Sequence, residues 1–242
     1  MKTNALILLF LLLAAGFSGK AQAASRDTES SQKVNIGIKV GFNSSMFFID
    51  RFSLGNTELK NLQNNYKVGY LGAFFCRFNM KKHHFFQTEF SYNISKGSIS
   101  IPNTAENIPL LQENALVKTD IHSIDVPLLY GYKFIDKYPY GMAFFIGPKA
   151  AYIWEKHSDS EYSGFYQQYI NEEMRPFSFS GVVGLSVNVS NIFFDFRYEV
   201  GLHNMVKSVS YNKDLTDAPY NTQDISLKHR HNVLSFSVGV IF

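Results

Sequence analysis

The sequence predicts an all-β protein, an eight-stranded antiparallel up-and-down transmembrane β-barrel, on three observations. Apolar and polar residues alternate with a period of two in eight separate runs. Short and long connections between these runs alternate along the chain. Aromatic residues make up 16% of the 242 residues, yet the mean hydropathy is only −0.10, so hydrophobic residues are not gathered in long blocks. This composition excludes an intrinsically disordered chain.

Residues 1–23 are predicted to be a signal peptide. Lys2 supplies a positive charge, residues 6–17 form an apolar stretch, and Ala21-Gln22-Ala23 has the small-x-small pattern of a cleavage site. The alternative is an uncleaved membrane anchor, but the apolar stretch is shorter than the roughly 20 residues that span a bilayer. We therefore expect residues 24–242 to form the barrel domain. No later run has the length of a membrane-spanning helix, so a membrane would be crossed by strands.

Each predicted strand places apolar side chains on one face and small or polar side chains on the other. The runs cover residues 34–42, 66–78, 86–94, 124–134, 144–154, 177–189, 194–202 and 234–242. The seventh run is the clearest, because Phe194, Phe196 and Tyr198 alternate there with Asp195 and Arg197. Eight such runs predict eight strands.

The connections between the predicted strands alternate in length. Residues 79–84, 135–139 and 190–191 are short connections, whereas residues 44–65, 97–118, 157–175 and 203–230 are long ones. Short turns at one end and long polar loops at the other are typical of outer-membrane barrels, whose short turns are periplasmic. The pattern therefore predicts a location in the cell outer membrane.

Ionic side chains fall on one face of these strands, and we expect that face to be the interior. The predicted interior ion-pair network consists of Lys39, Arg77, Glu89, Asp125, Lys133, Lys149, Asp195, Arg197 and Glu199. The opposite face is a band of Phe, Tyr, Val and Leu that is unfavourable in water, so we expect it to contact outer-membrane lipid and lipopolysaccharide. A soluble sandwich also uses alternating strands, but eight aromatic-rich faces would overfill its core. An open pore is not expected, because side chains fill the interior of an eight-stranded barrel.

Charge and cysteine content exclude several classes of protein. The chain carries 23 Lys and Arg against 20 Asp and Glu, and removal of Lys2 and Lys20 with the signal peptide brings it closer to neutrality. Binding to nucleic acid is therefore not expected, since it requires a basic face. Cys76 is the single cysteine, which excludes an internal disulfide and a site built from several thiolates.

A catalytic set is not predicted. His122, Ser123 and Asp125 begin the fourth strand, but the alternation places His122 on the opposite face from the other two. Histidines also occur in two close pairs, His83-His84 and His229-x-His231. A metal site requires three or four ligands, and neither pair has a third candidate. We expect solvated histidines at the barrel rims, with no metal and no cofactor.

Several stretches together resemble the PorT-like outer-membrane β-barrel family of Bacteroidetes, within the class of small OmpA-type barrels. They are residues 37–43, Thr88-Glu89-Phe90-Ser91-Tyr92 with Lys96-Gly97, Asp125-Val126-Pro127-Leu128-Leu129, Gly147-Pro148 with Ala151-Tyr152, Phe196-Arg197-Tyr198 with Gly201-Leu202, and Val238-Gly239-Val240-Ile241-Phe242. The resemblance implies a role in protein secretion through the type IX system, with secretion-system proteins as partners. It also implies that Phe236, Val238, Val240 and Phe242 form the assembly signal recognised by the barrel-assembly machinery.

The expected function is thus that of a non-enzymatic integral outer-membrane barrel, a component or accessory of type IX secretion. Two alternatives stay open, a stand-alone surface or structural barrel that binds ligands through its extracellular loops, and a barrel enzyme that modifies lipid A. The longest predicted loop, residues 201–228 with Tyr211 and Tyr220, is the expected contact surface.

Overall fold

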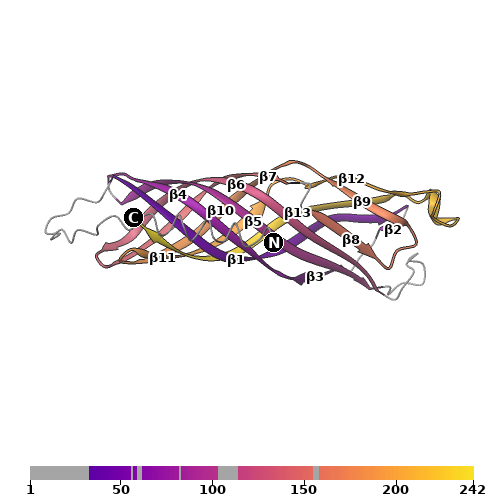
Figure 1. Cartoon of the computed structure of the whole chain (residues 1–242), viewed down its shortest axis with the longest axis horizontal. Coiled ribbons are helices and arrows are strands. Elements are labelled where there is room, and N and C mark those ends of the chain that lie inside the picture. Colours follow the sequence, from indigo (N-terminus) through magenta and orange to yellow (C-terminus); the bar gives the residue numbers. More distant parts are fainter. Residues whose placement is uncertain (1–32, 56, 59–61, 82, 103–113, 155–157) are drawn as a thin grey trace, which may run out of the picture. The chain divides into compact units, whose positions relative to one another are not determined.

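Antiparallel strands make up most of the described chain (Figure 1). The computed structural model describes residues 33–242, except for residues 56, 59–61, 82, 103–113 and 155–157. The predicted signal peptide, residues 1–23, lies outside the described residues. Residues Gln32–Phe242 form one unit, and the fold described below is that of this unit.

Eight strands form a closed ring. In chain order they are β1 (Val34–Leu54), β4 (Val68–Asn79), β5 (His84–Pro102), β6 (Asn114–Lys137), β7 (Tyr140–Ile153), β10 (Phe177–Val189), β11 (Ile192–Gly201) and β13 (Ile225–Ile241). Each strand pairs antiparallel with the next, and β13 pairs with β1 to close the ring. This confirms the predicted eight-stranded antiparallel up-and-down barrel. β1 begins and β13 ends at the side of the three short turns, as Gly37 pairs with Ile241.

The long connections are shorter than predicted, because the strands continue into them. β1 runs to Leu54 rather than ending before Ser44, β5 runs to Pro102, and β13 begins at Ile225 rather than after Arg230. The connections also contain short elements of their own. These are β2 (Thr57–Glu58), β3 (Gln63–Tyr66), β8 (Asp159–Ser163), β9 (Gln168–Met174), β12 (Val206–Asn212) and the 3₁₀ turn η2 (Tyr220–Thr222).

We call residues 45–66, 95–121, 154–176 and 202–233 the extension. In it, β2 adds to β1, β3 adds to β5 and β8 adds to β6, while β9 and β12 form a separate two-stranded ribbon. Predicted loop 201–228 is therefore structured, with β12 and η2 inside it. The described residues of the extension continue the barrel wall on the side opposite the short turns (Figure 1).

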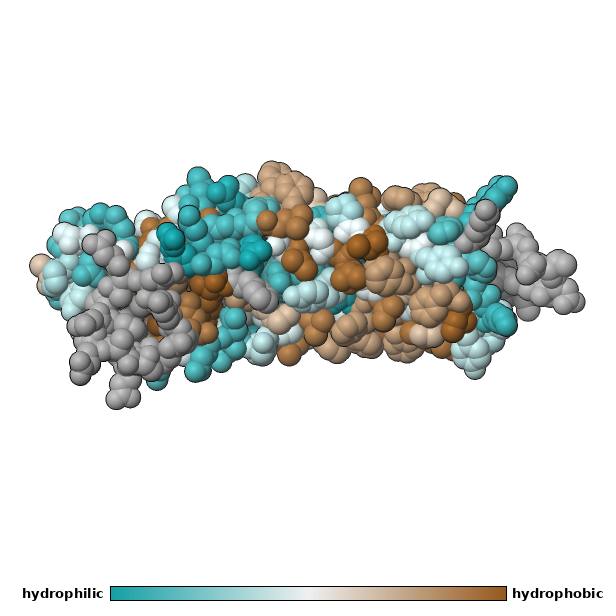
Figure 2. All heavy atoms as spheres, turned by 180° about the vertical axis from the view of Figure 1, so that it is seen from behind, coloured by the Kyte–Doolittle hydropathy of each residue, from teal (hydrophilic) through white to brown (hydrophobic). Residues whose placement is uncertain are grey.

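The outward side chains of the ring form an apolar belt. On β1, Val34, Ile36, Ile38, Val40 and Phe42 are all exposed. Figure 2 shows hydrophobic residues concentrated toward the end of the unit that carries the short turns, and mainly hydrophilic residues toward the extension. A band of this kind is unfavourable in water and matches a lipid environment.

The last strand carries the residues of the predicted assembly signal. Val238 and Val240 face outward on β13, Phe236 is half-buried, and Phe242 follows the strand and is exposed. These side chains belong to the apolar belt. Their recognition by the assembly machinery stays a prediction.

Four buried phenylalanines fill the lumen near the short turns, and each faces a glycine directly across from it on the neighbouring strand. The cross-strand pairs are Phe75 with Gly37, Phe85 with Gly131, Phe145 with Gly184, and Phe193 with Gly239. A Cβ atom added at any of these glycines would overlap the facing ring. The glycines therefore provide the space that lets large rings fit inside a narrow barrel.

We expect Gly131→Val to destabilise the barrel by about 1–3 kcal/mol, the usual cost of overpacking a filled core. The new side chain would collide with the Phe85 ring, which is completely buried. Gly181→Val is the matched control, because a Cβ at Gly181 meets no atom within 4 Å. The measurement is the temperature at which the folded form is lost on a gel run without boiling. Equal melting of the two variants would contradict this packing.

Candidate functional site: the barrel interior and the extension

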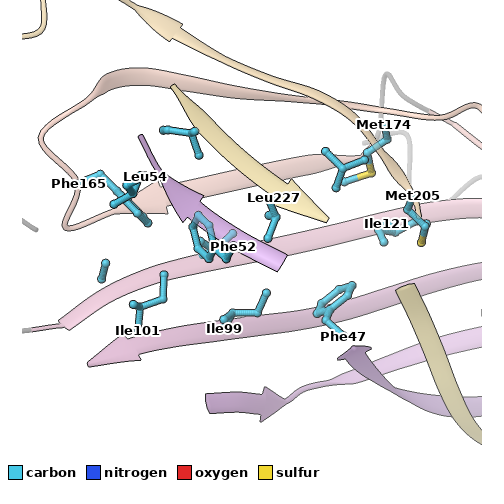
Figure 3. Close-up of a cluster of buried hydrophobic side chains, with 14 of the residues drawn as sticks. Phe47, Phe52, Leu54, Ile99, Ile101, Ile121, Phe165, Met174, Met205 and Leu227 are labelled. Atoms are coloured by element: carbon cyan, nitrogen blue, oxygen red, sulfur yellow. The ribbon is translucent and has the colours of Figure 1, made fainter. Parts of the chain in front are cut away.

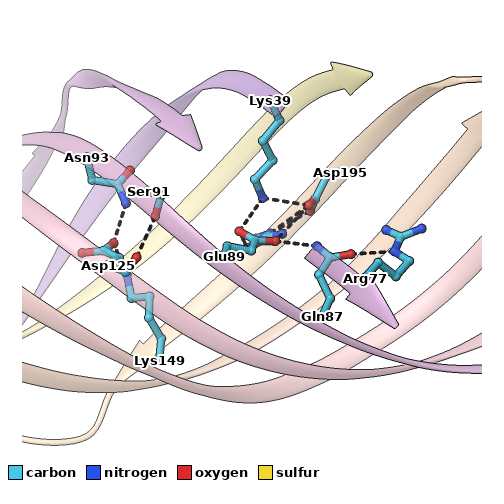
Figure 4. A network of polar contacts seen from close by, with 10 residues as sticks. Lys39, Arg77, Gln87, Glu89, Ser91, Asn93, Asp125, Lys149 and Asp195 are labelled. Atoms are coloured by element: carbon cyan, nitrogen blue, oxygen red, sulfur yellow. Dashed lines mark hydrogen bonds and ion pairs between the residues drawn. The ribbon is translucent and has the colours of Figure 1, made fainter. Parts of the chain in front are cut away.

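Four ionic side chains meet in the middle of the lumen, from β1, β5 and β11 (Figure 4). Lys39 Nζ lies 2.9 Å from Glu89 Oε2 and 3.1 Å from Asp195 Oδ2. Arg197 donates from Nη1 to Glu89 Oε2 at 2.9 Å and from Nε to Asp195 Oδ1 at 2.8 Å. All four side chains are buried. Each charge in this low-dielectric interior thus has a partner of opposite sign, as buried ions require.

Arg77 connects this group to the layer of phenylalanines. Its Nε donates to Gln87 Oε1 at 2.6 Å, and Gln87 Nε2 donates to Glu89 Oε1 at 2.5 Å. The guanidinium lies over the Phe85 ring, with Cζ 4.6 Å from the ring centroid. Arg77 is therefore held by an amide and by cation–π contact rather than by a direct ion pair.

A second group lies closer to the extension. Lys149 is paired with Asp125 at 2.9 Å and also with Glu199, and Asn93 donates to Asp125. Taken together, the two groups contain four cations, Lys39, Arg77, Lys149 and Arg197, and four anions, Glu89, Asp125, Asp195 and Glu199. With Arg77 counted in it, the first group has one excess positive charge, and the second group has one excess negative charge. The interior is therefore neutral as a whole, which limits the electrostatic cost of burying it.

Eight of the nine predicted network residues lie in these two groups, and Lys133 does not. Lys133 lies near the short turns, where it pairs with the partly exposed Asp136 at 3.5 Å. The alternation placed it on the inner face, but only the three-dimensional structure shows how far it lies from the other charges. Gln87 and Asn93, which the sequence pattern did not assign to the network, join it as neutral hydrogen-bonding links.

The interior leaves little free space. A cavity of about 30 Å³ lies beside the second ionic group, lined by residues that include Asp125, Lys149, Glu199 and His231. A volume of this size accommodates about one or two water molecules. Asp125 Oδ1 is buried without a hydrogen-bond partner among the described residues, so a water molecule would be well placed beside it. This cavity therefore has room for water but not for an organic ligand.

The interior changes from ionic to apolar inside the extension (Figure 3). Phe47, Phe52, Ile99, Ile101 and Leu227 point inward there and are fully or almost fully buried. The remaining buried members of this core are Leu54, Ala115, Val117, Ile121, Ile153, Phe165, Met174, Met205, Val206 and Ile225. The sequence pattern did not predict this core, because it assigned most of these residues to loops.

The polarity of the wall is thus reversed between the two parts of the molecule. In the belt the outer face is apolar and the lumen carries the charges, whereas in the extension the inner face is apolar, as in a protein surrounded by water. A register shift between Ile49 and Arg51 on β1 lets both Phe47 and Phe52 point inward, although they are five residues apart and would otherwise lie on opposite faces of the strand. Beyond the layer of phenylalanines, the lumen is closed twice more, first by ion pairs and then by an apolar core.

Of the two histidine pairs predicted to be solvated at the rims, His229 and His231 lie inside the extension. His229 is buried and its Nε2 lies 3.3 Å from Glu172 Oε1, on the β9–β12 ribbon. Tyr162 donates to Glu172 Oε2 at 2.8 Å. His231 is partly buried and contacts the Ser45 hydroxyl. The prediction of solvated histidines was therefore wrong for this pair, because β13 continues past them into an apolar core.

Glu172 fixes the ribbon to the barrel wall. Burial by itself raises the pKa of its carboxyl, but hydrogen bonds from His229 and Tyr162 and the charge of His229 outweigh burial, so the pKa lies below its usual value. A carboxyl with a lowered pKa stabilises the fold above its unfolded pKa, and this contribution is lost as the pH falls through the folded pKa.

We expect Glu172→Gln to loosen the ribbon by about 1.5–3 kcal/mol, the contribution of a hydrogen bond to a charged group. The measurement is hydrogen exchange of the β9 and β12 amides, corrected for the intrinsic pH dependence of exchange. In the wild type, exchange should accelerate as the pH falls below the usual pKa range of glutamate. In the variant, this acceleration should be weaker. Glu173→Gln is the matched control, because the neighbouring Glu173 side chain is accessible to solvent, where it pairs with the exposed Lys207 and accepts a hydrogen bond from the Ser208 hydroxyl. The same protection in E172Q and E173Q would refute this role.

The remaining candidate residues do not assemble a catalytic or metal site. The Tyr92 hydroxyl lies 2.7 Å from His122 Nδ1 on the outer face, whereas Ser123 and Asp125 are buried on the inner face. Within the part of the chain that the structure describes, no three His, Cys, Asp or Glu side chains are grouped as metal ligands.

No helix among the described residues is long and apolar enough to cross a membrane.

Known proteins provide an independent comparison. A family model described as outer membrane protein beta-barrel domain matches residues 20–207. The structure of the outer membrane protein OprG from Pseudomonas aeruginosa is similar over 86% of this chain and 95% of that chain, with a TM-score of 0.57 and 10% identity. At this identity the likeness concerns the fold alone. No curated protein sequence matches the chain.

Two further barrels are less similar. Ail, the attachment invasion locus protein of Yersinia pestis, has a TM-score of 0.39 and 13% identity over 87% of this chain and 99% of that chain. Neisserial surface protein A has a TM-score of 0.38 and 12% identity over 88% of this chain and 100% of that chain.

Proposed function

Because this chain belongs to the outer membrane protein β-barrel family, we propose that it is a plugged, non-enzymatic barrel that acts through its extension. It is an integral β-barrel protein of the cell outer membrane. We place the extension at the cell surface, since the long connections of such barrels are extracellular and the short turns periplasmic. Outer-membrane lipid and lipopolysaccharide would surround the belt, and the barrel-assembly machinery would insert it.

The observation that carries this proposal is the double closure of the lumen. Ion pairs around Arg197 and Glu89 fill the belt, and the apolar core around Phe47 and Phe52 fills the extension. Transport through the barrel would require both to open. The extension, opposite the short turns, is then the part of the molecule best suited to contact other molecules.

Within this frame we propose that the protein is a component or accessory of type IX protein secretion. The support is the resemblance of its sequence to the PorT-like barrels, together with the closed lumen, which favours contact with secretion-system proteins over transport by the barrel itself. The alternative, a stand-alone surface barrel that binds a ligand, would use the same extension. A lipid-A-modifying enzyme is disfavoured by the separation of His122 from Ser123 and Asp125.

Deletion of the gene tests this proposal. We expect secreted proteases and adhesins to disappear from the culture fluid and to accumulate in the periplasm, and we expect a plasmid-borne wild-type copy to restore them. Quantitative proteomics of both fractions is the measurement, with mass spectrometry of lipid A in parallel. Unchanged secretion with unchanged lipid A would reject the secretion role and favour the stand-alone barrel, and altered lipid A would favour the enzyme.

A further inference from the structure

The outermost part of the extension is built from two segments that meet. Residues 164–169, which reach into the start of β9, lie against residues 212–222, which begin at the last residue of β12 and form the yellow loop at the right-hand side of Figure 1. The Gln168 amide donates to Thr216 Oγ1 at 3.1 Å, and the rings of Tyr166 and Tyr220 stack with centroids 3.9 Å apart and planes 3° from parallel. We call these two segments the tip.

Hydrogen bonds hold the tip in one conformation. Asn212 Oδ1 accepts from the amides of Asp214 and Leu215, and the Thr216 hydroxyl donates to the Asn212 carbonyl at 2.7 Å. The Tyr211 hydroxyl donates to the Asn221 carbonyl at 3.0 Å. A surface that is already ordered loses little conformational entropy when it binds a partner.

Two large side chains are held out from this rigid base. Tyr169 is 76% exposed and Leu215 is 58% exposed, and they flank the hydrogen bond between Gln168 and Thr216. Tyr169 also has a φ of 54°, a left-handed conformation that is unfavourable for a bulky residue. Burial of the ring does not offset this backbone strain, because the ring is exposed. Strained residues of this kind are concentrated at binding and active sites.

The tip is acidic. Within the tip, residues 212–222 contain Asp214 and Asp217 against one cation, Lys213, and that lysine is paired at 3.4 Å with Asp224, which lies just beyond the tip. Asp214 and Asp217 are exposed, and within the described chain neither forms an ion pair. Anionic lipopolysaccharide does not complement such a surface. A cation does, because carboxylates attract it and tyrosine faces bind Arg and Lys side chains.

We infer that the tip is a docking surface for a basic partner protein, which would present Arg or Lys beside apolar side chains. Tyr169 and Leu215 are the apolar anchors, the stacked Tyr166 and Tyr220 are the platform, and Asp214 and Asp217 form the charged rim. In protein interfaces a few residues, often aromatic ones, contribute most of the binding energy. Exposed apolar side chains on a rigid base are suited to this role. The inference rests on the proposed function, in which the extension contacts proteins, and it specifies the surface and the chemistry of the partner.

The chemistry is tested with two fluorescein-labelled hexapeptides, one of alternating Trp and Arg and one of alternating Trp and Glu. The barrel is placed in nanodiscs of zwitterionic lipid, and binding is followed by fluorescence anisotropy, with empty nanodiscs as the blank. We expect the Trp-Arg peptide to bind and the Trp-Glu peptide not to bind. We expect affinity for the Trp-Arg peptide to fall at least fivefold in the double variant Y169S/L215S and at least fivefold in D214N/D217N.

The double variant D120N/E161Q is the matched control, because it also removes two acidic charges from the exposed surface of the extension, at ion pairs with Lys96 and Lys118. We expect it to bind the Trp-Arg peptide within twofold of the wild type. The substituted side chains are exposed, so each variant should keep its folded gel mobility. Equal affinity of wild type, tip variants and control would overturn the docking surface, as would equal binding of the two peptides.

A second measurement separates this inference from the secretion role. The Y169S/L215S variant replaces the chromosomal gene, and the culture fluid is compared with those of the wild type and the deletion strain. Loss of secreted proteases in the variant, at normal barrel abundance, is the expected result. If the deletion blocks secretion and the variant does not, the docking surface is wrong and the proposed function stands. If the deletion itself leaves secretion intact, the proposed function fails, and peptide binding alone decides whether the tip is a docking surface.

Discussion

Replacing Arg197 with Leu is expected to lower sharply the temperature at which the folded, gel-shifted form of the barrel is lost. Arg197 binds both Glu89 and Asp195 in the lumen, and all three side chains are buried. Removal of the guanidinium would leave two carboxylates with Lys39 as their nearest cation. Breaking a buried ion pair in this way costs about 3–5 kcal/mol.

Arg230→Leu is the matched control for this prediction. Arg230 also forms a bidentate ion pair, with Asp50. Both side chains are about half exposed on the extension. An exposed pair contributes about 0–1 kcal/mol, so R230L should melt close to the wild type. A melting temperature of R197L as high as that of R230L would mean that the interior charges do not form a stabilising plug.

A second substitution should partly repair R197L. The double variant R197L/E89Q removes one charge of each sign and keeps the Lys39–Asp195 pair, which is 3.1 Å long. Since much of the cost in R197L comes from the uncompensated carboxylate, the double variant should be more stable than the single variant. Additive losses would indicate that the lost contacts of Arg197 matter more than the charge left behind.

Replacing Leu227 with Ala is expected to disorder the extension while the belt stays folded. Leu227 is buried in the apolar core of the extension, opposite Phe52 on β1. A buried Leu→Ala substitution costs about 2–5 kcal/mol. Because this core is separate from the ionic plug, the loss should appear as local opening. Limited proteolysis of intact cells should cut within the extension, and the gel shift of the remaining barrel should persist.

Leu202→Ala is the matched control, because it is the same substitution at an exposed position, directly after β11. We expect L202A to resist protease like the wild type. A global loss of the gel shift in L227A, matching that of R197L, would show that the extension and the belt unfold as one cooperative unit.

The strand pattern of the belt could be predicted from the sequence because the medium on each side of the wall is uniform there. Side chains of one strand alternate between lipid and lumen, so Phe194, Phe196 and Tyr198 on one face and Asp195 and Arg197 on the other already indicate which face is which. The same alternation placed Lys39, Glu89 and Arg197 inside. Ring closure followed from the even number of strands and the alternating loop lengths.

The extension could not be predicted in this way, for two reasons. Apolar side chains change from the outer face to the inner face where the wall leaves the belt, and a register shift between Ile49 and Arg51 then interrupts the alternation. Phe47, Phe52 and Leu54 are inward apolar residues, whereas Val40 and Phe42 on the same strand are outward ones. If lipid is assumed to surround the whole wall, strand residues with apolar side chains on the inner face do not fit the pattern and are assigned to loops. For the same reason His229 was expected in solvent, although it lies in the apolar core.

The barrel, its apolar belt and the set of charges that point into the lumen are predictable from the sequence, since they depend only on the order of polar and apolar residues along each strand. Three-dimensional packing determines which charges pair, which ring faces which glycine, and where the lumen closes. Arg197 and Glu89 are 108 residues apart, and Phe85 faces Gly131 from another strand. Such contacts depend on strand register and on three-dimensional packing, which no local pattern encodes.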